Sequence, residues 1–283
     1  MSNMRLSRSI VGKAEAQAVS RIITDIGYLG MGTEVQALEK DIAAYLGTKP
    51  EHVTCVNTGT AALHLATLAA IPAGSEVLVP SLTYVASFQA IRMAGSEPVA
   101  CDVLLETGTI DLKDAETRIT ERTKAIMPVH YASNPGDLDA VYAFAQKHGL
   151  RIIEDAAHAF GNTYKGKKIG GFGDIVCFSF DGIKNITCGE GGAIVSQDPA
   201  VNEFVRDARL LSVEHDTEKR YAGTRSWDFD VKHIGYRYHM SNIMAAIGRT
   251  QLPRLDSEFA PARRTLSRLY REHLAGVPDI AFF

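Results

Sequence analysis

The 283-residue sequence has no long apolar run, only four cysteines and no large excess of charge of either sign. Its most apolar stretches, such as residues 76–80 and 125–129, are far shorter than the roughly 20 residues of a membrane-spanning helix, so we expect no transmembrane segment. Thirty basic and thirty-three acidic side chains leave a formal net charge of −3, which provides no overall field to attract nucleic acid or an anionic membrane. An anionic ligand must therefore be held by local groups.

The four cysteines, Cys55, Cys101, Cys177 and Cys188, include no Cys-x-x-Cys pair, and no histidine stands beside them at metal-site spacing. We therefore expect no metal site, and we interpret all four as small buried side chains in a reducing compartment. The first ten residues carry basic side chains with no apolar run after them, which disfavours a secretory signal. Together these features predict a cytoplasmic protein.

What the sequence does contain is a repeated pattern, in which a short apolar run is followed by a longer stretch with apolar residues at helical spacing. This alternation is typical of an α/β fold with a mostly parallel sheet. The expected strands are residues 53–56, 76–80, 97–102, 125–130, 151–155, 174–180 and 192–196. The expected helices between them are residues 60–70, 84–94, 138–148 and 199–211.

The alternation stops after residue 196. Residues 213–233 are polar and show no clear period, so we expect a loop there. Two further helices are expected over residues 241–255 and 261–273, with Ser241 and Pro261 well placed to start them. We interpret these helices as the beginning of a smaller second domain.

Four segments lie where expected strands end, which is where ligands collect in folds of this class. In the first, residues 57–62, Thr-Gly-Thr leads into an Ala/Leu-rich helix. Free backbone N–H groups and a hydroxyl at the positive end of a helix form a cradle suited to a phosphate. The alternative interpretation is a threonine that only caps the helix.

In the second segment, residues 151–158, apolar residues lead into an acidic pair that brings Asp155 to the end of its strand. A carboxylate there can pair with a protonated ring nitrogen and keep a pyridinium charged near neutral pH. His158 would lie one helical turn further on if a helix starts at this point. The alternative is an aspartate that only caps such a helix.

The third segment carries Lys184 in a glycine-containing turn directly after a buried strand, which is an unusual position for a solvated ammonium group. We interpret Lys184 as an amine that forms a Schiff base with an aldehyde. Ser179 could add a hydroxyl to a phosphate site. The fourth segment, residues 80–86, places Tyr84 where its ring could stack on a planar cofactor, although it could equally be an ordinary core or edge aromatic.

These motifs together resemble those of the DegT-type nucleotide-sugar aminotransferases, which are fold-type-I enzymes that use pyridoxal 5'-phosphate (PLP). The resemblance covers residues 22–255 and rests on Thr-Gly-Thr, Glu-Asp-Ala-Ala-His-Ala and Phe-Ser-Phe-x-x-x-Lys-Asn-x-x-x-Gly-Glu-Gly-Gly, in this order. It implies an aspartate aminotransferase-like α/β fold with a mostly parallel seven-stranded sheet. The PLP-binding large domain would be residues 1–212, and residues 213–283 would be a loop and the start of an incomplete small domain.

The resemblance also implies roles for single residues. Lys184 corresponds to the lysine that binds the cofactor covalently, and Asp155 to the carboxylate paired with the pyridine nitrogen. The other implied cofactor contacts are with the phosphate (Gly59, Thr60, Ser179), the ring hydroxyl (His158) and the ring face (Tyr84).

One motif departs from the family pattern. Where the family usually has Gly-Tyr-Asn-Tyr-Arg, with an Asn that reaches across a dimer interface to the neighbouring cofactor phosphate, residues 235–239 read Gly-Tyr-Arg-Tyr-His. We expect Arg237 to take over this contact, because a guanidinium can bind phosphate through two hydrogen bonds.

The implied reaction is transfer of an amino group from glutamate to a keto group of a nucleotide-linked deoxysugar, in a homodimer with shared active sites. The dehydratases of the family carry His at the lysine position, so Lys184 argues against that activity. A PLP-binding but inactive regulatory protein and a scaffold without cofactor are the alternatives. We expect the choice of sugar, nucleotide and ring position to depend on loops such as residues 27–33 and 213–233.

Overall fold

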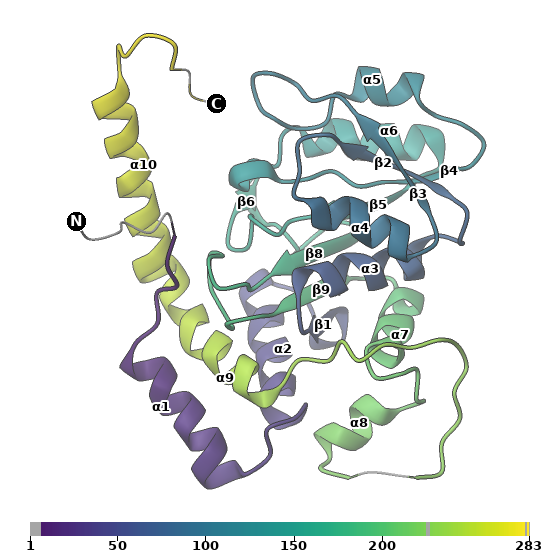
Figure 1. Ribbon diagram of the computed structural model, residues 1–283, viewed down its shortest axis with the longest axis vertical. Coiled ribbons are helices and arrows are strands. Elements are labelled where there is room, and N and C mark those ends of the chain that lie inside the picture. Colours follow the sequence, from purple (N-terminus) through teal and green to yellow (C-terminus); the bar gives the residue numbers. More distant parts are fainter. Residues whose placement is uncertain (1–6, 225–226, 281, 283) are drawn as a thin grey trace.

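The computed structural model describes residues 7–224, 227–280 and 282. The remaining residues belong to the expected large domain (1–6), the expected loop (225–226) and the C-terminal end (281 and 283). A seven-stranded sheet in the order β1-β9-β8-β5-β4-β2-β3 forms the centre of the molecule (Figure 1). Its strands are β1 (Val53–Val56), β2 (Glu76–Pro80), β3 (Glu97–Cys101), β4 (Thr123–Ile126), β5 (Arg151–Asp155), β8 (Ile175–Ser179) and β9 (Gly192–Ser196).

The sheet is parallel except for β9, which pairs antiparallel with both β1 and β8. Because β1 and β8 are each opposite in direction to β9, they run the same way as β5, β4, β2 and β3. Val56 at the end of β1 and Ser179 at the end of β8 both pair with Gly192. All strands but β9 therefore end at one edge of the sheet, and the expected mostly parallel sheet is confirmed.

Helices cover both faces of the sheet (Figure 1). Along β8, Val176 and Phe178 pack into the core on the α2 side, whereas Ile175 and Cys177 pack with residues of α3 and α7, as the two-residue period of a strand requires. The helices are α1 (Lys13–Arg21), α2 (Thr33–Leu46), α3 (Gly59–Ala70), α4 (Val85–Met93), α5 (Leu112–Thr117), α6 (Leu138–His148), α7 (Pro199–Ala208), α8 (Asp216–Tyr221), α9 (Asn242–Gln251) and α10 (Ala260–Leu274). Short helical turns are Ile22–Ile26, Pro50–His52, Tyr131–Ser133, Leu252–Arg254 and Leu255–Phe259, and β6 (Thr163–Tyr164) pairs with β7 (Lys167–Lys168) in a small hairpin.

Several sequence expectations need correction. The expected loop over residues 213–233 contains helix α8, and the expected helix over residues 241–255 ends as an α-helix at Gln251 before tighter and wider turns follow. No helix starts after Asp155, because the chain continues in turns there. Helices α1, α2 and α5 and the β6-β7 hairpin were not expected.

Helix α8 is held by a buried polar cluster that no local pattern signals. Arg209 is fully buried and donates to Glu39 Oε1 at 2.6 Å and to the hydroxyl of Tyr221, the last residue of α8, at 3.1 Å. The Tyr221 hydroxyl in turn donates to Glu39 Oε2 at 2.7 Å. Because Glu39 belongs to α2 and Tyr221 to α8, these hydrogen bonds fix α8 against α2.

The C-terminal helices α9 and α10, which we call the arm, lie at one side of the molecule (Figure 1). Helix α9 packs against α1 and α2, whereas α10 extends past the edge at which the parallel strands end and buries none of its residues. All four cysteines are buried free thiols. Among the helices that the structure describes, none has the length and apolar character to cross a membrane.

Candidate active site

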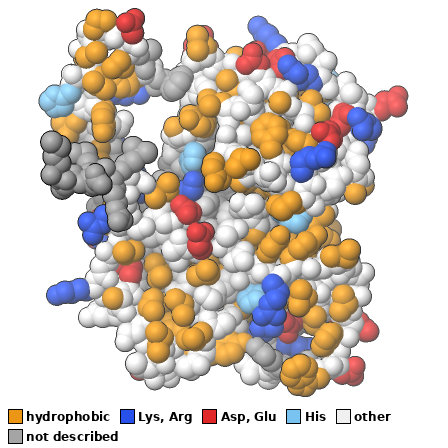
Figure 2. All heavy atoms as spheres, in the orientation of Figure 1, with side chains coloured by type: hydrophobic (Ala, Val, Ile, Leu, Met, Phe, Trp, Pro, Cys, Tyr) orange, Lys and Arg blue, Asp and Glu red, His pale blue; other side chains and the backbone are white. Residues whose placement is uncertain are grey.

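The four segments singled out in the sequence follow the carboxyl ends of β1, β2, β5 and β8, which share one edge of the sheet. This edge faces α10 (Figure 1). Figure 2 shows basic, acidic and histidine side chains close together where the body of the molecule meets the arm. The topology thus gathers residues that are more than 100 positions apart in the chain.

Asp155 ends β5 and is 5% exposed. Its Oδ2 accepts a hydrogen bond from Ser87 Oγ at 2.7 Å, and its Oδ1 accepts one from the backbone N–H of Ala157 at 3.2 Å. The Ser87 hydroxyl, which comes from the first turn of α4, is itself 2.7 Å from Thr83 Oγ1. Within the described residues, Asp155 forms no ion pair. A buried carboxylate with hydrogen bonds but no cation is suited to receive a positively charged ligand atom.

His158 lies three residues further on, in a turn rather than a helix, so the helix-capping alternative for Asp155 is wrong. Burial lowers the pKa of His158, the positive charge of Lys184 lowers it further, and the negative charge of Asp155 partly opposes both. The carbonyl of His158 accepts hydrogen bonds from Ser133 Oγ and from Asn185 Nδ2, the latter at 3.2 Å. His158 is therefore close enough to both Lys184 and Asp155 for their charges to act on it.

Lys184 lies in a tight turn, residues 181–185, which we call the lysine turn. Its N–H donates to the carbonyl of Asp181 at 3.1 Å, and the N–H of Phe180 donates to the carbonyl of Gly191 at 2.8 Å, which closes the loop between β8 and β9. The Lys184 residue is partly buried. Its amine has no ion-pair partner in the part of the chain that the structure describes. Lys184 is thus a partly buried lysine near His158.

The expected cradle is the N-terminus of α3. The threonine that caps the helix is Thr58, whose Oγ1 accepts from the N–H of Ala61 at 3.0 Å. The N–H groups of Gly59 and Thr60, in the first turn, have no acceptor within the helix. Ser179 is close enough that a Cβ added at Gly59 would lie 2.7 Å from Ser179 Cβ and 3.1 Å from its hydroxyl. Free N–H groups, a helix N-terminus and a hydroxyl therefore meet at one point.

Substitution Gly59→Ala is expected to destabilise the protein by about 1–2 kcal/mol, because overpacking against Ser179 costs roughly 1–3 kcal/mol and alanine regains up to about 1 kcal/mol of helix propensity. Urea unfolding would measure the loss. The matched background is Ser179→Gly, in which the obstructing Cβ is absent and Gly59→Ala should cost much less. An equal cost in both backgrounds would show that this contact is not the cause.

Tyr84 directly precedes α4, and its side chain is 73% exposed, which excludes the core alternative. Its carbonyl accepts from the N–H of Ser87 at 3.2 Å, so Tyr84 and the serine that contacts Asp155 belong to one turn. The ring is thus free to cover a ligand held at Asp155.

Among the described residues, no hydrogen bond or ion pair joins Arg237 to Lys184. The carbonyl of Arg237 accepts from Asn57 Nδ2 at 3.4 Å, close to the start of α3, while its exposed side chain lines a cavity of about 280 Å³ with Trp227 and Arg220. Burial and the charges of Arg220, Arg237 and Arg209 lower the pKa of the nearby His239 to about 4. Asp216, which lines the same cavity, pairs with Arg220 at 2.7 Å.

Ser87, Asn185 and Thr58 were missed in the sequence. No local signal marked Ser87, because Thr83, whose hydroxyl lies 2.7 Å from it, precedes the helix, and only the fold brings Ser87 to Asp155. Thr58 carried a local signal, because a threonine before a glycine and an alanine-rich run is a typical capping residue.

A family model described as the DegT/DnrJ/EryC1/StrS aminotransferase family matches residues 10–282. The chain belongs to this family. The aminotransferase is also similar to solved structures. An aminotransferase TlmJ from Streptoalloteichus hindustanus is 32% identical with a TM-score of 0.88, and the match covers 97% of this chain and 72% of that one.

Two further structures give the same result. The sugar aminotransferase CalS13 from Micromonospora echinospora is 32% identical with a TM-score of 0.86, covering 97% of this chain and 74% of that one. Spr1654 from Streptococcus pneumoniae, in its PLP form, is 30% identical with a TM-score of 0.86, covering 97% and 72%. The family resemblance and the fold expected from the sequence are thereby confirmed, and this aminotransferase is an enzyme of the PLP-dependent sugar aminotransferase class.

Proposed function

We propose that this aminotransferase binds PLP at the shared strand edge and transfers an amino group from glutamate to a keto group of a nucleotide-linked deoxysugar. The observation that carries the proposal is the meeting of Asp155, His158 and Lys184 at the edge where the α3 cradle also opens. The cytoplasmic location expected from the cysteines stays a prediction.

The residues present fit the cofactor. The space beside Ser179 that a side chain at position 59 would fill is open, and the N-terminus of α3 supplies unused N–H donors for a phosphate. Asp155 offers a buried negative charge without a cation partner among the described residues, which suits a protonated pyridine nitrogen. His158 would contact the ring hydroxyl and Tyr84 the ring face.

Bound PLP supplies an electron sink that stabilises negative charge on the carbon attached to the transferred nitrogen. Lys184 Nζ would hold the cofactor covalently, and as a free amine it would be the base that takes the proton from the α-carbon of the amino donor. Asp155 keeps its partner nitrogen protonated, so its charge acts most strongly in the transition state. Because the amino donor and the keto sugar react in turn, we expect ping-pong kinetics.

The test is a half-reaction followed by a substrate panel. The purified protein with PLP should absorb visible light, and glutamate should convert it to the aminated, blue-shifted form; a panel of nucleotide-linked keto sugars should then reverse that change. A spectrum that glutamate leaves unchanged would favour the alternative, an inactive PLP-binding regulatory protein. Protein that stays colourless with PLP would contradict both.

We further propose that residues 1–212 form the cofactor domain, that residues 213–283 contain a loop and the start of a smaller domain, and that two chains pair with shared sites. Trp227 is 90% and Ile234 81% exposed beside Arg237, and apolar surface of this kind is typical of an interface. In such a pair Arg237 would bind the phosphate held by the partner subunit.

Substitution Arg237→Gln is expected to weaken PLP binding by about tenfold or more, because hydrogen bonds from a charged donor contribute about 1.5–3 kcal/mol. Titration of the apoprotein with PLP measures the affinity, and sedimentation measures the dimer. Arg237→Lys keeps the charge but not the planar guanidinium, so its PLP affinity should lie between those of the wild type and Arg237→Gln. Unchanged affinity and unchanged dimerisation in Arg237→Gln would rule out the proposed role.

A further inference from the structure

An arginine of helix α10 binds the backbone of the lysine turn. Arg263, in the first turn of α10, donates from one guanidinium nitrogen to the carbonyl of Lys184 and from the other to the carbonyl of Asn185, each at 3.0 Å. These contacts join positions 79 and 78 residues apart. Burial lowers the pKa of Arg263, and no acidic side chain pairs with it within the described ranges. Its hydrogen bonds are thus devoted to the turn that carries the reactive amine.

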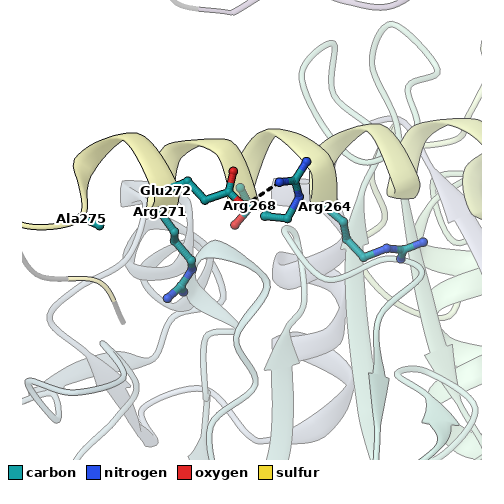
Figure 3. Close-up of a pocket in the computed structure, with 6 residues that line it drawn as sticks. Arg264, Arg268, Arg271, Glu272 and Ala275 are labelled. Atoms are coloured by element: carbon teal, nitrogen blue, oxygen red, sulfur yellow. Dashed lines mark hydrogen bonds and ion pairs between the residues drawn. The ribbon is translucent and has the colours of Figure 1, made fainter.

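The other arginines of α10 behave differently. Arg264, Arg268 and Arg271 line a shallow surface cavity of about 520 Å³, where Arg268 pairs with Glu272 (Figure 3). Arg263 instead lines a cavity of only about 30 Å³ together with Lys184 and Asn185. The contrast between neighbours on one helix indicates that Arg263 is directed at the lysine turn and not merely at solvent.

Two more contacts hold the same turn. Ser9 Oγ donates to the carbonyl of Gly182 at 2.5 Å, and Asn185 Nδ2 donates to the carbonyls of His158 at 3.2 Å and Phe160 at 2.8 Å. The Asn185 side chain therefore ties the turn to the segment after Asp155, while Arg263 holds it on the side of α10. Among these contacts, only those of Arg263 reach the carbonyl of Lys184 itself.

We propose that Arg263 is a positioning residue for Lys184. One planar guanidinium that binds two successive carbonyls fixes the two peptide planes on either side of Asn185, and the first of these planes sets the direction in which Lys184 leaves the backbone. Loss of Arg263 frees both planes and lets the amine sample directions away from Asp155 and His158. The inference rests on the proposed function, because it requires Lys184 to form a covalent bond with an aldehyde.

The test compares two ligands of the apoprotein. PLP binds through the phosphate cradle, the ring contacts and the bond to Lys184, whereas 4'-deoxypyridoxine 5'-phosphate has the same ring and phosphate but no aldehyde. Arg263→Ala should weaken PLP binding by about tenfold, as expected for the loss of charged hydrogen bonds, and change the affinity for the deoxy compound by less than about twofold. Arg263→Lys, which can keep one of the two bonds, should recover part of the PLP affinity.

Arg264→Ala is the matched control, because it makes the same change one position along α10 at an exposed side chain, and it should leave both affinities unchanged. Equal weakening of both ligands, or no weakening of either, in Arg263→Ala or Arg263→Lys would overturn the proposal. Should Arg263→Ala fail to fold, Arg263→Lys decides by the same comparison. A wild-type protein in which borohydride fixes no cofactor on Lys184 would instead refute the proposed function.

Discussion

Lys184→Ala is expected to reduce amino transfer by at least about 10⁴-fold, because proton transfer by a positioned base alone contributes about 10²–10⁴-fold and the variant also loses its covalent link to the cofactor. The fold should be retained, since the Lys184 side chain makes no ion pair among the described residues and the backbone bonds of the lysine turn do not need it. Turnover of glutamate with a keto sugar measures the loss.

Borohydride reduction and peptide mass analysis give the second measurement. In the wild type the mass of the cofactor should be found on the peptide that contains Lys184, and in the variant on none. Lys167→Ala is the matched control, because Lys167 is an exposed lysine in the β6-β7 hairpin and should affect neither result. Retained turnover in Lys184→Ala, or a label on another lysine, would refute the assignment.

Asp155→Asn is expected to slow amino transfer by about 10²–10³-fold while PLP still binds, because the loss of one preorganised charge at a reacting centre costs about this much. Asparagine has nearly the same size and keeps an acceptor for the N–H of Ala157 or the hydroxyl of Ser87. The change therefore removes the negative charge with little effect on packing, and single-turnover rates with glutamate would measure it.

Two comparisons separate the charge of Asp155 from its hydrogen bonds. Ser87→Ala removes the hydroxyl that orients the carboxylate but keeps the charge, so its loss should be about tenfold. A cofactor methylated on its ring nitrogen is permanently positive and should restore part of the rate of Asp155→Asn. If the methylated cofactor gives no recovery and Ser87→Ala is as slow as Asp155→Asn, the carboxylate acts through geometry and not through charge.

Much of the sheet could be predicted because a buried strand has a recognisable local sequence pattern. The runs at residues 53–56, 76–80, 151–155 and 192–196 match β1, β2, β5 and β9 to the residue. A short apolar run is bounded by turn residues on both sides, and nothing distant is needed to recognise it. The strand ends then indicated which residues could meet at one edge.

The buried charges of helix α2, in contrast, could not be predicted from the local sequence. Val35, Leu38 and Ile42 follow a helical spacing that was available to inspection, but Glu34 and Glu39 on the same helix are buried and look like surface charges in the sequence. Glu34 has one nearby partner, Arg21, but its second partner, Arg249, and the partner of Glu39, Arg209, lie 215 and 170 residues away. Local reasoning cannot anticipate that a charge is buried when the neutralising group is more than 100 residues distant.

The residues of the candidate site also differ in whether the local sequence reveals them. Lys184, Asp155 and the glycine of the cradle carry local signals, since each follows a strand in a motif that is unusual for a solvated residue. Ser87 and Arg263 carry none, because a serine in a helix and an arginine on an amphipathic helix are ordinary, and only tertiary contact gives them a partner. Residues that orient a functional group are therefore harder to predict than the group itself.

The reversed strand β9 also bears on the order in which the site is assembled. The lysine turn is part of the connection of the β8-β9 hairpin, so it can form from contacts that are close in sequence. The cradle after β1 must wait, because β1 pairs with β9 in the sheet and its Val56 also forms a bridge with His239, and all of these partners lie more than 130 residues from β1. During synthesis, residues 53–60 leave the ribosome long before residue 192, and a chain released early would carry a phosphate cradle with no sheet to hold it. Cofactor capture should thus be one of the last events of folding, and the visible colour of the bound cofactor would report when the first strand has docked.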